Sequence, residues 1–559
     1  MIPTSTPVGP LLDIEDLTLT LPNGTELLRG ITLHVEAGET VGLVGESGSG
    51  KSLTARTALG LFPDGSVLGG SVTVDGVAVV GDEGAGILDI RRHRAAMIFQ
   101  DPRAGINPMR TIGDHMTETL RLVERKSPAE ARARAIELLA AVKLPNPEEH
   151  LGQYPHEFSG GMLQRVMIAG ALTSAPKLLI CDEPTTALDV TTQAGIIQVL
   201  AEQREERGMG MLFITHDLNL AASICDRVYV MSKGLIEEQG PAVQVFRDPQ
   251  RAYTKRLVEA TPTVSVDPVV ERAQRDETQQ ADLEGSVRFD SVVPPSLNEP
   301  QPALSVKGVS KTYVRRGKTP VRAVIDAELD IPRGGALGVV GESGSGKSTL
   351  ARMIVGLEHP DAGDIRIAGR ERTGAAKSRA ERLAHAKSVQ MVFQDPYLSL
   401  DPRIPAGRAI QDVLALHTTL SAADAKKRVL ELLDAVGLDE RHAQARPKTL
   451  SGGQRQRVAI ARAIAIEPDV LVMDEATSAL DVSVQAQVLD MVAEVRRERG
   501  LTVLFISHDL GVVRRVCERT VVMRRGEIVE AGPTVQLLSD PQHDYTRLLL
   551  DSVPKPVAA

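Results

Sequence analysis

The pattern of apolar positions along this chain predicts buried strands that each end at a polar segment. Two continuously apolar runs, 41–44 and 337–340, lead directly into glycine-rich segments. Two others, 178–181 and 470–473, show no alternation and end at acidic residues. Short continuous apolar runs are typical of parallel strands that are buried on both faces. The alternation in 17–21 instead predicts a half-buried strand near the start of the chain.

Helices are predicted between these strands. Ser127, Pro128 and Glu130 stand at the spacing of a capping box with proline in the first helical position. Ser421 opens a matching segment, and Gly437 is placed to end it. The leucines and methionines of these segments recur at helical spacing, so we assign them to core packing.

The chain repeats itself. GESGSGKS occurs at 45–52 and 341–348, FQDP at 99–102 and 393–396, and SGG at 159–161 and 451–453, in the same order and at a nearly constant separation. We therefore predict two homologous halves. The segment between them is rich in proline, glutamine and acidic residues, which is typical of a linker. The predicted parts are a disordered N-terminus 1–10, a first domain 11–262, a linker 263–301 and a second domain 302–559.

Composition narrows the class of protein. The chain has 559 residues, 42% hydrophobic and 25% charged residues, and a formal net charge of −9. No apolar run approaches the ~18 residues that span a bilayer, and no secretory signal opens the chain, so we expect a cytoplasmic protein. An acidic balance argues against general nucleic-acid binding. The three cysteines stand in apolar surroundings and are predicted to be core residues.

Each glycine-rich segment has the form G-x-x-x-x-G-K-S between a predicted strand and a predicted helix. Glycine lets the backbone curl so that several N–H groups face a phosphate, and the helix adds its positive N-terminal end. The lysine reaches the β- and γ-phosphates of ATP, and the following serine supplies a hydroxyl to Mg²⁺. The predicted phosphate-binding residues are Gly45, Glu46, Ser47, Gly48, Ser49, Gly50, Lys51 and Ser52, with Gly341, Glu342, Ser343, Gly344, Ser345, Gly346, Lys347, Ser348 and Thr349.

Two predicted strands end in a pair of acids, Asp182-Glu183 and Asp474-Glu475. A carboxylate at the end of a buried strand is costly without a cation or a partner. We predict that the first acid of each pair holds Mg²⁺ and that the second polarises the water that attacks the γ-phosphate.

At this point the sequence resembles the nucleotide-binding domains of ABC transporters, and the resemblance covers nearly the whole chain outside the linker. The family carries a phosphate loop, a glutamine loop, a signature near LSGGQ, an Asp-Glu pair and a switch histidine, and each motif occurs twice here. The resemblance implies an α/β fold with two P-loop domains, each with a RecA-like core, an antiparallel β subdomain and a helical subdomain. It implies catalytic roles for Gln100, Gln394, His216 and His508, and it places both glutamines among the Mg²⁺ ligands.

The resemblance also implies a head-to-tail arrangement in which each ATP lies between the phosphate loop of one half and the signature of the other. The implied signature residues are Ser159, Gly160 and Gly161 in the first half, and Ser451, Gly452, Gly453 and Gln454 in the second. Two departures stand out. Met162 occupies the place of the usual signature glutamine. Tyr313 is placed to stack on adenine, whereas the matching position of the first half is Leu21.

Three features are similar to the oligopeptide, dipeptide and nickel importers: the FQDP segments, the YPHEFSGGM segment at 154–162, and the tails 248–257 and 540–548. This implies an ATPase that energises the import of di- or oligopeptides on the cytoplasmic face of the membrane. Its partners would be two transmembrane permease subunits and an extracytoplasmic binding protein, with membrane contact only through the permeases. The alternatives are the ATPase of an exporter and a soluble twin-domain factor acting on ribosomes or nucleic acid. Dipeptides, oligopeptides, glutathione and nickel chelates all stay open as substrates.

Overall fold

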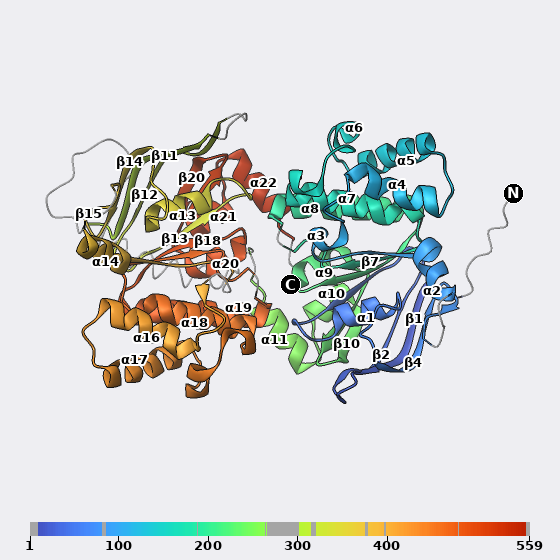
Figure 1. Cartoon of the computed structure of the whole chain (residues 1–559), viewed down its shortest axis with the longest axis horizontal. Helices are drawn as coiled ribbons and strands as arrows, with labels where there is room; N and C mark the ends of the chain where they lie inside the picture. Colours follow the sequence, from blue (N-terminus) through green and yellow to red (C-terminus); the bar gives the residue numbers. More distant parts are fainter. Residues whose placement is uncertain are drawn as a thin grey trace. The chain divides into compact units, whose positions relative to one another are not determined.

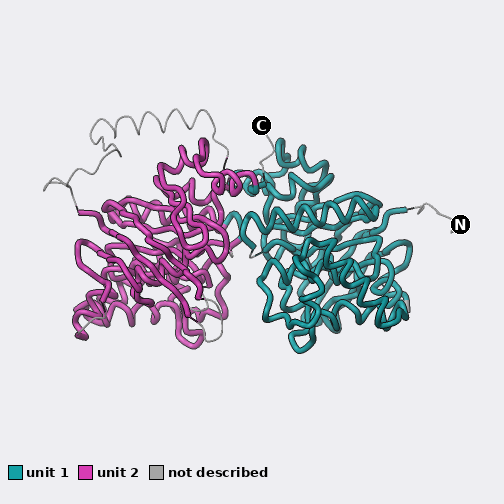
Figure 2. The backbone as a smooth tube through the Cα atoms, turned by 90° about the horizontal axis from the view of Figure 1, so that it is seen from above, with its two compact units in different colours: residues 1–261, 481–483, 552–559 teal, residues 262–480, 484–551 magenta. Residues whose placement is uncertain are grey.

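The computed structural model describes residues 9–80, 85–186, 188–262, 264, 301–314, 320–374, 378–395, 399–478 and 480–554. The chain divides into two compact units (Figures 1 and 2), the first built on Met1–Thr261 and the second on Pro262–Leu480 and Val484–Asp551. Most of the predicted N-terminal segment 1–10 and nearly all of the predicted linker 263–301 lie outside the described residues. Both stay predictions.

A six-stranded sheet in the order β10-β9-β3-β8-β7-β6 forms the centre of the first unit. All neighbours pair in parallel except β9 and β10. Every residue of β3, β7 and β8 is buried, which confirms the strands predicted from continuous apolar runs. The strands are β3 (Thr40–Val44), β6 (Ala95–Ile98), β7 (Leu178–Asp182), β8 (Gly210–Thr215), β9 (Arg227–Ser232) and β10 (Leu235–Pro241).

A second, antiparallel sheet in the order β2-β1-β4-β5 completes the β structure of the first unit. Burial along β1 largely alternates, as predicted for a half-buried strand. The register between β1 and β4 shifts between Glu15 and Thr18, and Asp16 there has φ 47°. The strands are β1 (Leu12–Thr20), β2 (Glu26–Val35), β4 (Val67–Val74) and β5 (Val77–Ala78).

Helices pack on the central sheet and form a mainly helical segment between β6 and β7 (Figure 1). The helices of the first unit are α1 (Lys51–Thr57), α2 (Ala85–Asp89), the π-helix η1 (Ile90–Arg94), α3 (Pro102–Gly105), α4 (Ile112–Leu122), α5 (Pro128–Ala141), α6 (Pro147–His150), η2 (Pro155–Glu157), α7 (Gly160–Ala171), η3 (Leu172–Ser174), α8 (Val190–Arg207), α9 (Leu218–Ile224), α10 (Ala242–Arg247) and α11 (Ala252–Ala260).

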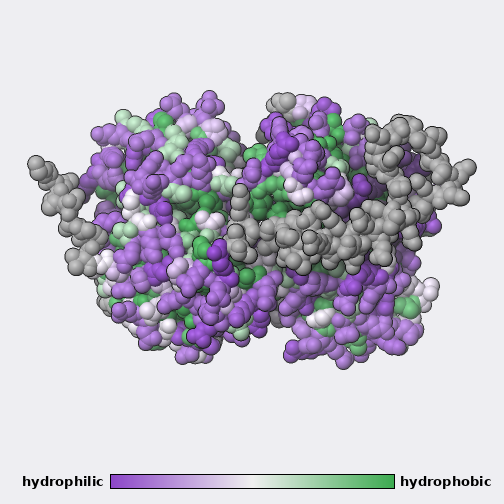
Figure 3. Space-filling view, turned by 180° about the vertical axis from the view of Figure 1, so that it is seen from behind, coloured by the Kyte–Doolittle hydropathy of each residue, from purple (hydrophilic) through white to green (hydrophobic). Residues whose placement is uncertain are grey.

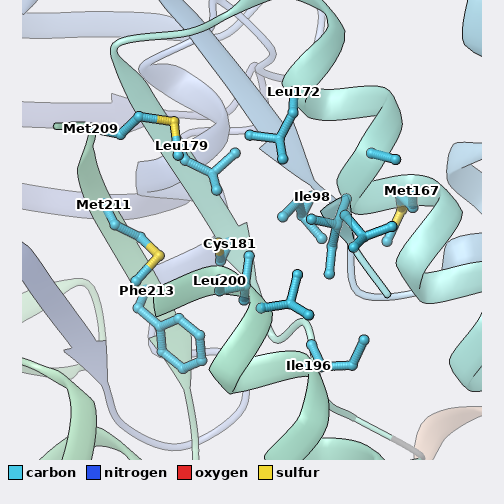
Figure 4. Close-up of a cluster of buried hydrophobic side chains, with 14 of the residues drawn as sticks. Ile98, Met167, Leu172, Leu179, Cys181, Ile196, Leu200, Met209, Met211 and Phe213 are labelled. Atoms are coloured by element: carbon cyan, nitrogen blue, oxygen red, sulfur yellow. The ribbon is translucent and has the colours of Figure 1, made fainter. Parts of the chain in front are cut away.

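The core between the sheet and these helices holds β7 in place. Figure 4 shows Cys181 of β7 and Phe213 of β8 facing Ile196 and Leu200 of α8, and all four side chains are almost completely buried. Burial of these apolar side chains stabilises the contact between sheet and helix by ~25 cal/mol per Å² of apolar surface removed from water. Cys181 is a core residue, as predicted, and so are Cys225 and Cys517. The packing therefore fixes the end of β7, where Asp182 lies.

The second unit repeats this architecture. Its sheets run β12-β11-β14-β15 and β16-β17-β18-β13-β19-β20, which match the strand orders of the first unit. The strands are β11 (Leu304–Tyr313), β12 (Val321–Ile331), β13 (Ala336–Val340), β14 (Ala362–Ile367), β15 (Arg370–Glu371), β16 (Val389–Val392), β17 (Val470–Asp474), β18 (Thr502–Ile506), β19 (Arg519–Arg524) and β20 (Glu527–Pro533). The two halves predicted from the sequence repeats are thus confirmed as equivalent folds.

The helices of the second unit follow the same plan. They are α13 (Lys347–Val355), α14 (Arg379–Ser388), α16 (Ala406–His417), α17 (Ala422–Ala435), η4 (Glu440–Gln444), η5 (Pro447–Thr449), α18 (Gly452–Ile464), α19 (Val482–Arg499), α20 (Leu510–Val516), α21 (Thr534–Ser539) and α22 (Asp544–Ser552).

The predicted helix ends are confirmed. Ser127 caps α5 in a complete capping box with Glu130, and Ser421 caps α17. Gly437 follows α17 with φ 66°, and its N–H donates to the carbonyl of Asp434. Short polar signals at helix ends were therefore sufficient to place both helices.

On the face in Figure 3, hydrophilic residues predominate. Within the described ranges, no helix combines the length and the apolar character that crossing a bilayer requires.

Candidate functional site

Both glycine-rich segments form loops that only glycine can build. Gly45 and Gly341 have φ of 146° and 149°, and a Cβ there would lie 2.2 Å from the carbonyl oxygens of Met231 and Met523. Gly50 and Gly346 have φ of 107° directly before α1 and α13. The backbone therefore curls at the carboxyl end of a buried strand and enters a helix, which is the arrangement that cradles phosphate.

The lysine of each loop folds back over the loop. Lys51 Nζ donates to the carbonyls of Gly45 at 2.7 Å and Glu46 at 2.8 Å. Lys347 Nζ makes the same bonds to Gly341 and Glu342, at 2.7 and 2.8 Å. Both side chains are about 5% exposed or less, and burial lowers the pKa of Lys51. Each ammonium group is thus held above the curl of N–H groups, where a phosphate oxygen can accept from it.

One hydroxyl in each loop is buried without a partner. Ser49 Oγ and Ser345 Oγ have no hydrogen-bond partner among the described residues, and each side chain is 3% exposed. A buried unsatisfied hydroxyl costs about 1–3 kcal/mol. Phosphate oxygens are strong acceptors, so the loops fit the triphosphate of ATP.

A hydroxyl and a carboxylate meet beside each loop. Ser52 Oγ donates to Asp182 Oδ1 at 2.7 Å, and Ser348 Oγ donates to Asp474 Oδ1 at 3.0 Å. Burial raises the pKa of both aspartates. Hydroxyl and carboxylate oxygens are the ligands that Mg²⁺ prefers, and a cation would restore the charge balance of the buried acid. The serine and aspartate of each predicted ligand set therefore fit Mg²⁺, and the part of Gln100 and Gln394 in the metal site stays a prediction.

The second acid of each pair adopts an unusual backbone conformation. Glu183 has φ 47° and Glu475 has φ 48°. This left-handed region is uncommon for a side chain larger than glycine and costs of order 1 kcal/mol. The backbone N–H of Glu183 donates to the carbonyl of Ile214 in β8, so the neighbouring strand holds this turn. The turn brings the carboxyl group to the end of the sheet instead of continuing the strand.

Three side chains converge on the Glu183 carboxylate. Gln100 Nε2 and Thr186 Oγ1 each donate to Oε2 at 2.9 Å, and His216 Nδ1 lies 3.3 Å from the same oxygen. Burial raises the pKa of the Glu183 carboxyl, but the contacts from His216 and Thr186 outweigh that effect and leave the pKa below its usual value. Glu183 is thus ionised and ready to accept a proton or a hydrogen bond from water.

The switch histidines hold the matching position in both units. Burial lowers the pKa of His216 and His508, but the paired glutamate outweighs burial and the pKa of each is raised. His508 Nδ1 lies 3.6 Å from Glu475 Oε1. Gln394 follows β16 as Gln100 follows β6, and both glutamines are exposed. The structure therefore brings the predicted catalytic residues of each unit to one end of its central sheet.

The signature serines begin helices. Ser159 caps α7 by accepting from the N–H of Met162, and Ser451 caps α18 by accepting from the N–H of Gln454. Gln454 Oε1 in turn accepts from the N–H of Ser451 and so completes a capping box, which methionine at 162 cannot do. Substituting methionine for glutamine therefore removes one anchor of the first signature and leaves its serine cap in place.

The signature glycines permit close helix packing. A Cβ on Gly161 would lie 2.5 Å from Thr192 Cγ2, and one on Gly453 would lie 2.3 Å from Val484 Cγ1. Gly160 and Gly452 stand in the first turns of α7 and α18. The exposed helix N-termini keep free backbone N–H groups that an anion can bind.

The two predicted adenine positions differ as the sequence indicates. Tyr313 ends β11, is 36% exposed, and its hydroxyl donates to Glu358. Leu21 directly follows β1 and packs partly buried against the core. At these two positions the second unit therefore carries an aromatic ring and the first an aliphatic side chain.

Sequence reasoning did not find two features of these sites. Thr186 binds the Glu183 carboxylate, and the signal for it was its place three residues after an acid that ends a strand. Tyr253 and Tyr545 of the tails reach the phosphate loops, although the tail motif was recognised only as a family feature. The roles of all the predicted site residues stay predictions.

Comparison with known proteins gives the following matches. The family profile described as "ABC transporter" matches residues 28–186 and 324–478. The profile described as "Oligopeptide/dipeptide transporter, C-terminal region" matches residues 529–559. The glutathione import ATP-binding protein GsiA of Pectobacterium atrosepticum is 40% identical over 553 residues, which cover 95% of this chain and 87% of that protein. GsiA of Escherichia coli K12 is 38% identical over 566 residues, which cover 98% and 90%.

Single cassettes match among solved structures. The dimeric structure of MJ0796, a bacterial ABC transporter cassette, is 31% identical, covers 41% of this chain and 98% of that chain, and gives a TM-score of 0.39. The structure of cbiO1 from Clostridium perfringens, part of the ABC transporter complex cbiONQ, is 27% identical, covers 43% and 92%, and gives a TM-score of 0.38.

The histidine–glutamate contacts predict a pH dependence in the nucleotide-free protein. A raised pKa means that the pair stabilises the fold fully below the unfolded value of about 6.5, and that this contribution is lost as pH rises through the folded pKa. We expect NMR titration of labelled histidines to give His216 a pKa above about 6.5, and Glu183→Gln to lower it. His508 serves as the internal control, since only Glu475→Gln should shift it. An unchanged His216 titration in Glu183→Gln would contradict the assignment.

Proposed function

Because the chain belongs to the family of ABC transporter ATP-binding proteins, we propose that it is the ATP-hydrolysing subunit that drives an importer of small peptides. One observation carries this proposal. The chain joins two ABC transporter domains to the C-terminal region of oligopeptide/dipeptide transporters. Relatives named as glutathione import ATP-binding proteins match it over 95% or more of its length, which includes both units.

Binding of ATP is assigned to the two loops. The curled backbone N–H groups receive phosphate oxygens, and Lys51 and Lys347 leave the loop carbonyls to donate to the β- and γ-phosphates. Mg²⁺, when bound, would neutralise charge on the phosphate oxygens. Ser52 with Asp182, and Ser348 with Asp474, would hold it, with Gln100 and Gln394 nearby.

Hydrolysis is assigned to the glutamates that follow. Glu183 and Glu475 accept a hydrogen bond from the attacking water and so orient it in line with the γ-phosphate. His216 and His508 hold the glutamate side chains and donate toward the developing charge. The protein contributes position and electrostatics, and no covalent intermediate is needed.

Transport requires the hydrolysis sites to change shape. Each site would be completed by the signature of the opposite half: Ser451 and Gly453 for the loop of Lys51, and Ser159 and Gly161 for the loop of Lys347. A helix N-terminus and a serine hydroxyl would then meet the γ-phosphate. ATP closes the halves, and hydrolysis with product release reopens them. Joining both halves in one chain raises their effective concentration.

The proposed partners follow from the importer assignment. Two transmembrane permease subunits would form the path, and an extracytoplasmic binding protein would deliver the substrate. This chain would then sit on the cytoplasmic face of the membrane, with its glutamine-loop regions 100–108 and 394–402 facing the permeases. The substrate class is di- or oligopeptides, which includes glutathione.

The importer proposal is tested by purifying the tagged chain with its partners from gently solubilised membranes. We expect two permeases and a binding protein, and we expect mass spectrometry of that binding protein to identify a bound peptide. Recovery with a lone permease would indicate an exporter instead. Recovery with ribosomes would indicate a soluble translation factor.

Both glutamates are expected to be needed for turnover. The double variant Glu183→Gln/Glu475→Gln should lower the ATPase rate by at least about 100-fold, because a positioned base contributes about 10²–10⁴. ATP binding should persist, since the loops are unchanged. Glu202→Gln, which alters an exposed glutamate of α8 paired with Lys143, is the matched control and should leave turnover unchanged. Normal turnover in a correctly folded double variant would contradict the proposed mechanism.

The second phosphate loop is expected to bind ATP more tightly than the first. Aromatic stacking by Tyr313 adds about 0.5–1.5 kcal/mol, or roughly two- to tenfold in affinity. Calorimetry on Lys51→Ala, which leaves the second loop intact, should therefore give a lower Kd than calorimetry on Lys347→Ala. Adding Tyr313→Leu should erase the difference. Equal affinities in the two lysine variants would contradict the prediction that Tyr313 strengthens ATP binding at the second loop.

A further inference from the structure

The tail helix of each unit, α11 or α22, contacts the phosphate loop of the same unit. Tyr253 of α11 accepts a hydrogen bond on its hydroxyl oxygen from the backbone N–H of Glu46, at 3.3 Å. Tyr545 of α22 accepts from the N–H of Glu342 at 3.0 Å. The tyrosine and its loop partner are about two hundred residues apart in each half. The same contact therefore arises twice from separate parts of the sequence.

The tail helices are themselves anchored to the sheet. Glu238 of β10 accepts from the backbone N–H groups of Gln250 and Arg251, at 2.8 and 3.1 Å. Glu530 of β20 accepts from Gln542 and His543 at the same two distances. A carboxylate that binds backbone N–H groups at a helix start makes strong, charge-assisted bonds. The tyrosines thus belong to helices whose starts are anchored to the central sheet.

The contacted residue has both backbone polar groups engaged. In the first unit, the N–H of Glu46 binds Tyr253 and its carbonyl accepts from Lys51 Nζ at 2.8 Å. The preceding Gly45 already lies against the carbonyl of Met231. The tyrosine therefore holds the first turn of the loop through a different backbone group from the one the lysine binds, and this contact does not require the lysine contact.

We propose that Tyr253 and Tyr545 are positioning residues that keep the phosphate loops in the shape that binds ATP. A loop that is already curled loses less conformational freedom when the phosphates bind, so the hydroxyl contact favours affinity. The inference rests on the proposed function, since it takes the loops to be ATP sites. It adds that the peptide-transporter tail is part of the nucleotide site.

The contact is built more strongly in the second unit. Tyr545 is 2% exposed, and the Arg524 guanidinium carbon lies 4.7 Å from the centre of its ring. Tyr253 is only partly buried. A buried hydrogen bond is stronger than one that competes with water. Removal of the hydroxyl should therefore have the larger effect at the second loop.

The test removes only the hydroxyl. Tyr545→Phe is combined with Lys51→Ala, so that calorimetry with ATP and Mg²⁺ reports the second loop; Tyr253→Phe is combined with Lys347→Ala for the first. Loss of the hydroxyl contact with the loop should raise Kd about two- to tenfold, more for Tyr545 than for Tyr253. Hydrogen exchange of the loop peptide should become faster, while the thermal midpoint should fall by no more than about 2–4 °C per kcal/mol lost, because the ring still fills its space.

Two further variants keep the result interpretable. Tyr229→Phe removes a hydroxyl that accepts from the N–H of His34 and from the Arg227 guanidinium, and it should alter neither Kd nor loop exchange. Glu530→Gln weakens the anchoring of the tail helix and should weaken ATP binding at the second loop. This variant replaces Tyr545→Phe in the test if Tyr545→Phe does not fold. Unchanged Kd and unchanged exchange in the folded variants would overturn the inference. Failure of the Lys51→Ala parent to bind ATP would instead count against the proposed function.

Discussion

Both sites depend on an aspartate at the end of a buried strand. Strands β7 and β17 are covered on both faces, so Asp182 and Asp474 cannot move out to solvent without disturbing the core. Burial disfavours their charged form, and a serine hydroxyl on each aspartate, with the Arg56 guanidinium 3.5 Å from Asp182, offsets this only in part. The incompletely compensated charge of the aspartates explains why a lysine and a potential cation site lie beside them. Positive charge is needed at the edge of the sheet, and the fold delivers it there.

The two halves reach the same architecture with different local chemistry. The helix after each phosphate loop ends against an arginine: Arg91 of η1 donates to the carbonyl of Leu59, and Arg372, which follows β15, donates to that of Val355. These arginines come from different positions in the repeated fold. The signatures differ in the same way, since Gln454 closes a capping box that Met162 leaves open. Duplication has kept the geometry of the sites while the residues that support it have diverged.

Much of the site was predictable because its motifs are local. The strand, loop and helix around Lys51 lie within a few turns of each other, so their spacing could be read directly, and the cap at Ser127 needs only four residues. The positive φ of Glu183 could not be read, since nothing in a glutamate indicates it and the register with β8 imposes it. The contact of Tyr545 with the loop also escaped, because it depends on how the tail packs after the whole sheet has formed.

The backbone at Glu183 and Glu475 has a consequence for how such a sequence changes over time. Both residues occupy a conformation that glycine adopts freely and that a side chain makes costly. Replacement by glycine would relieve that cost. If stability were the only property under selection, glycine would therefore be favoured over glutamate at these positions. Under the proposed function, the requirement for a carboxylate in hydrolysis opposes that replacement at both turns. A copy of this gene that is no longer needed for transport would be expected to lose the two glutamates before it loses the fold.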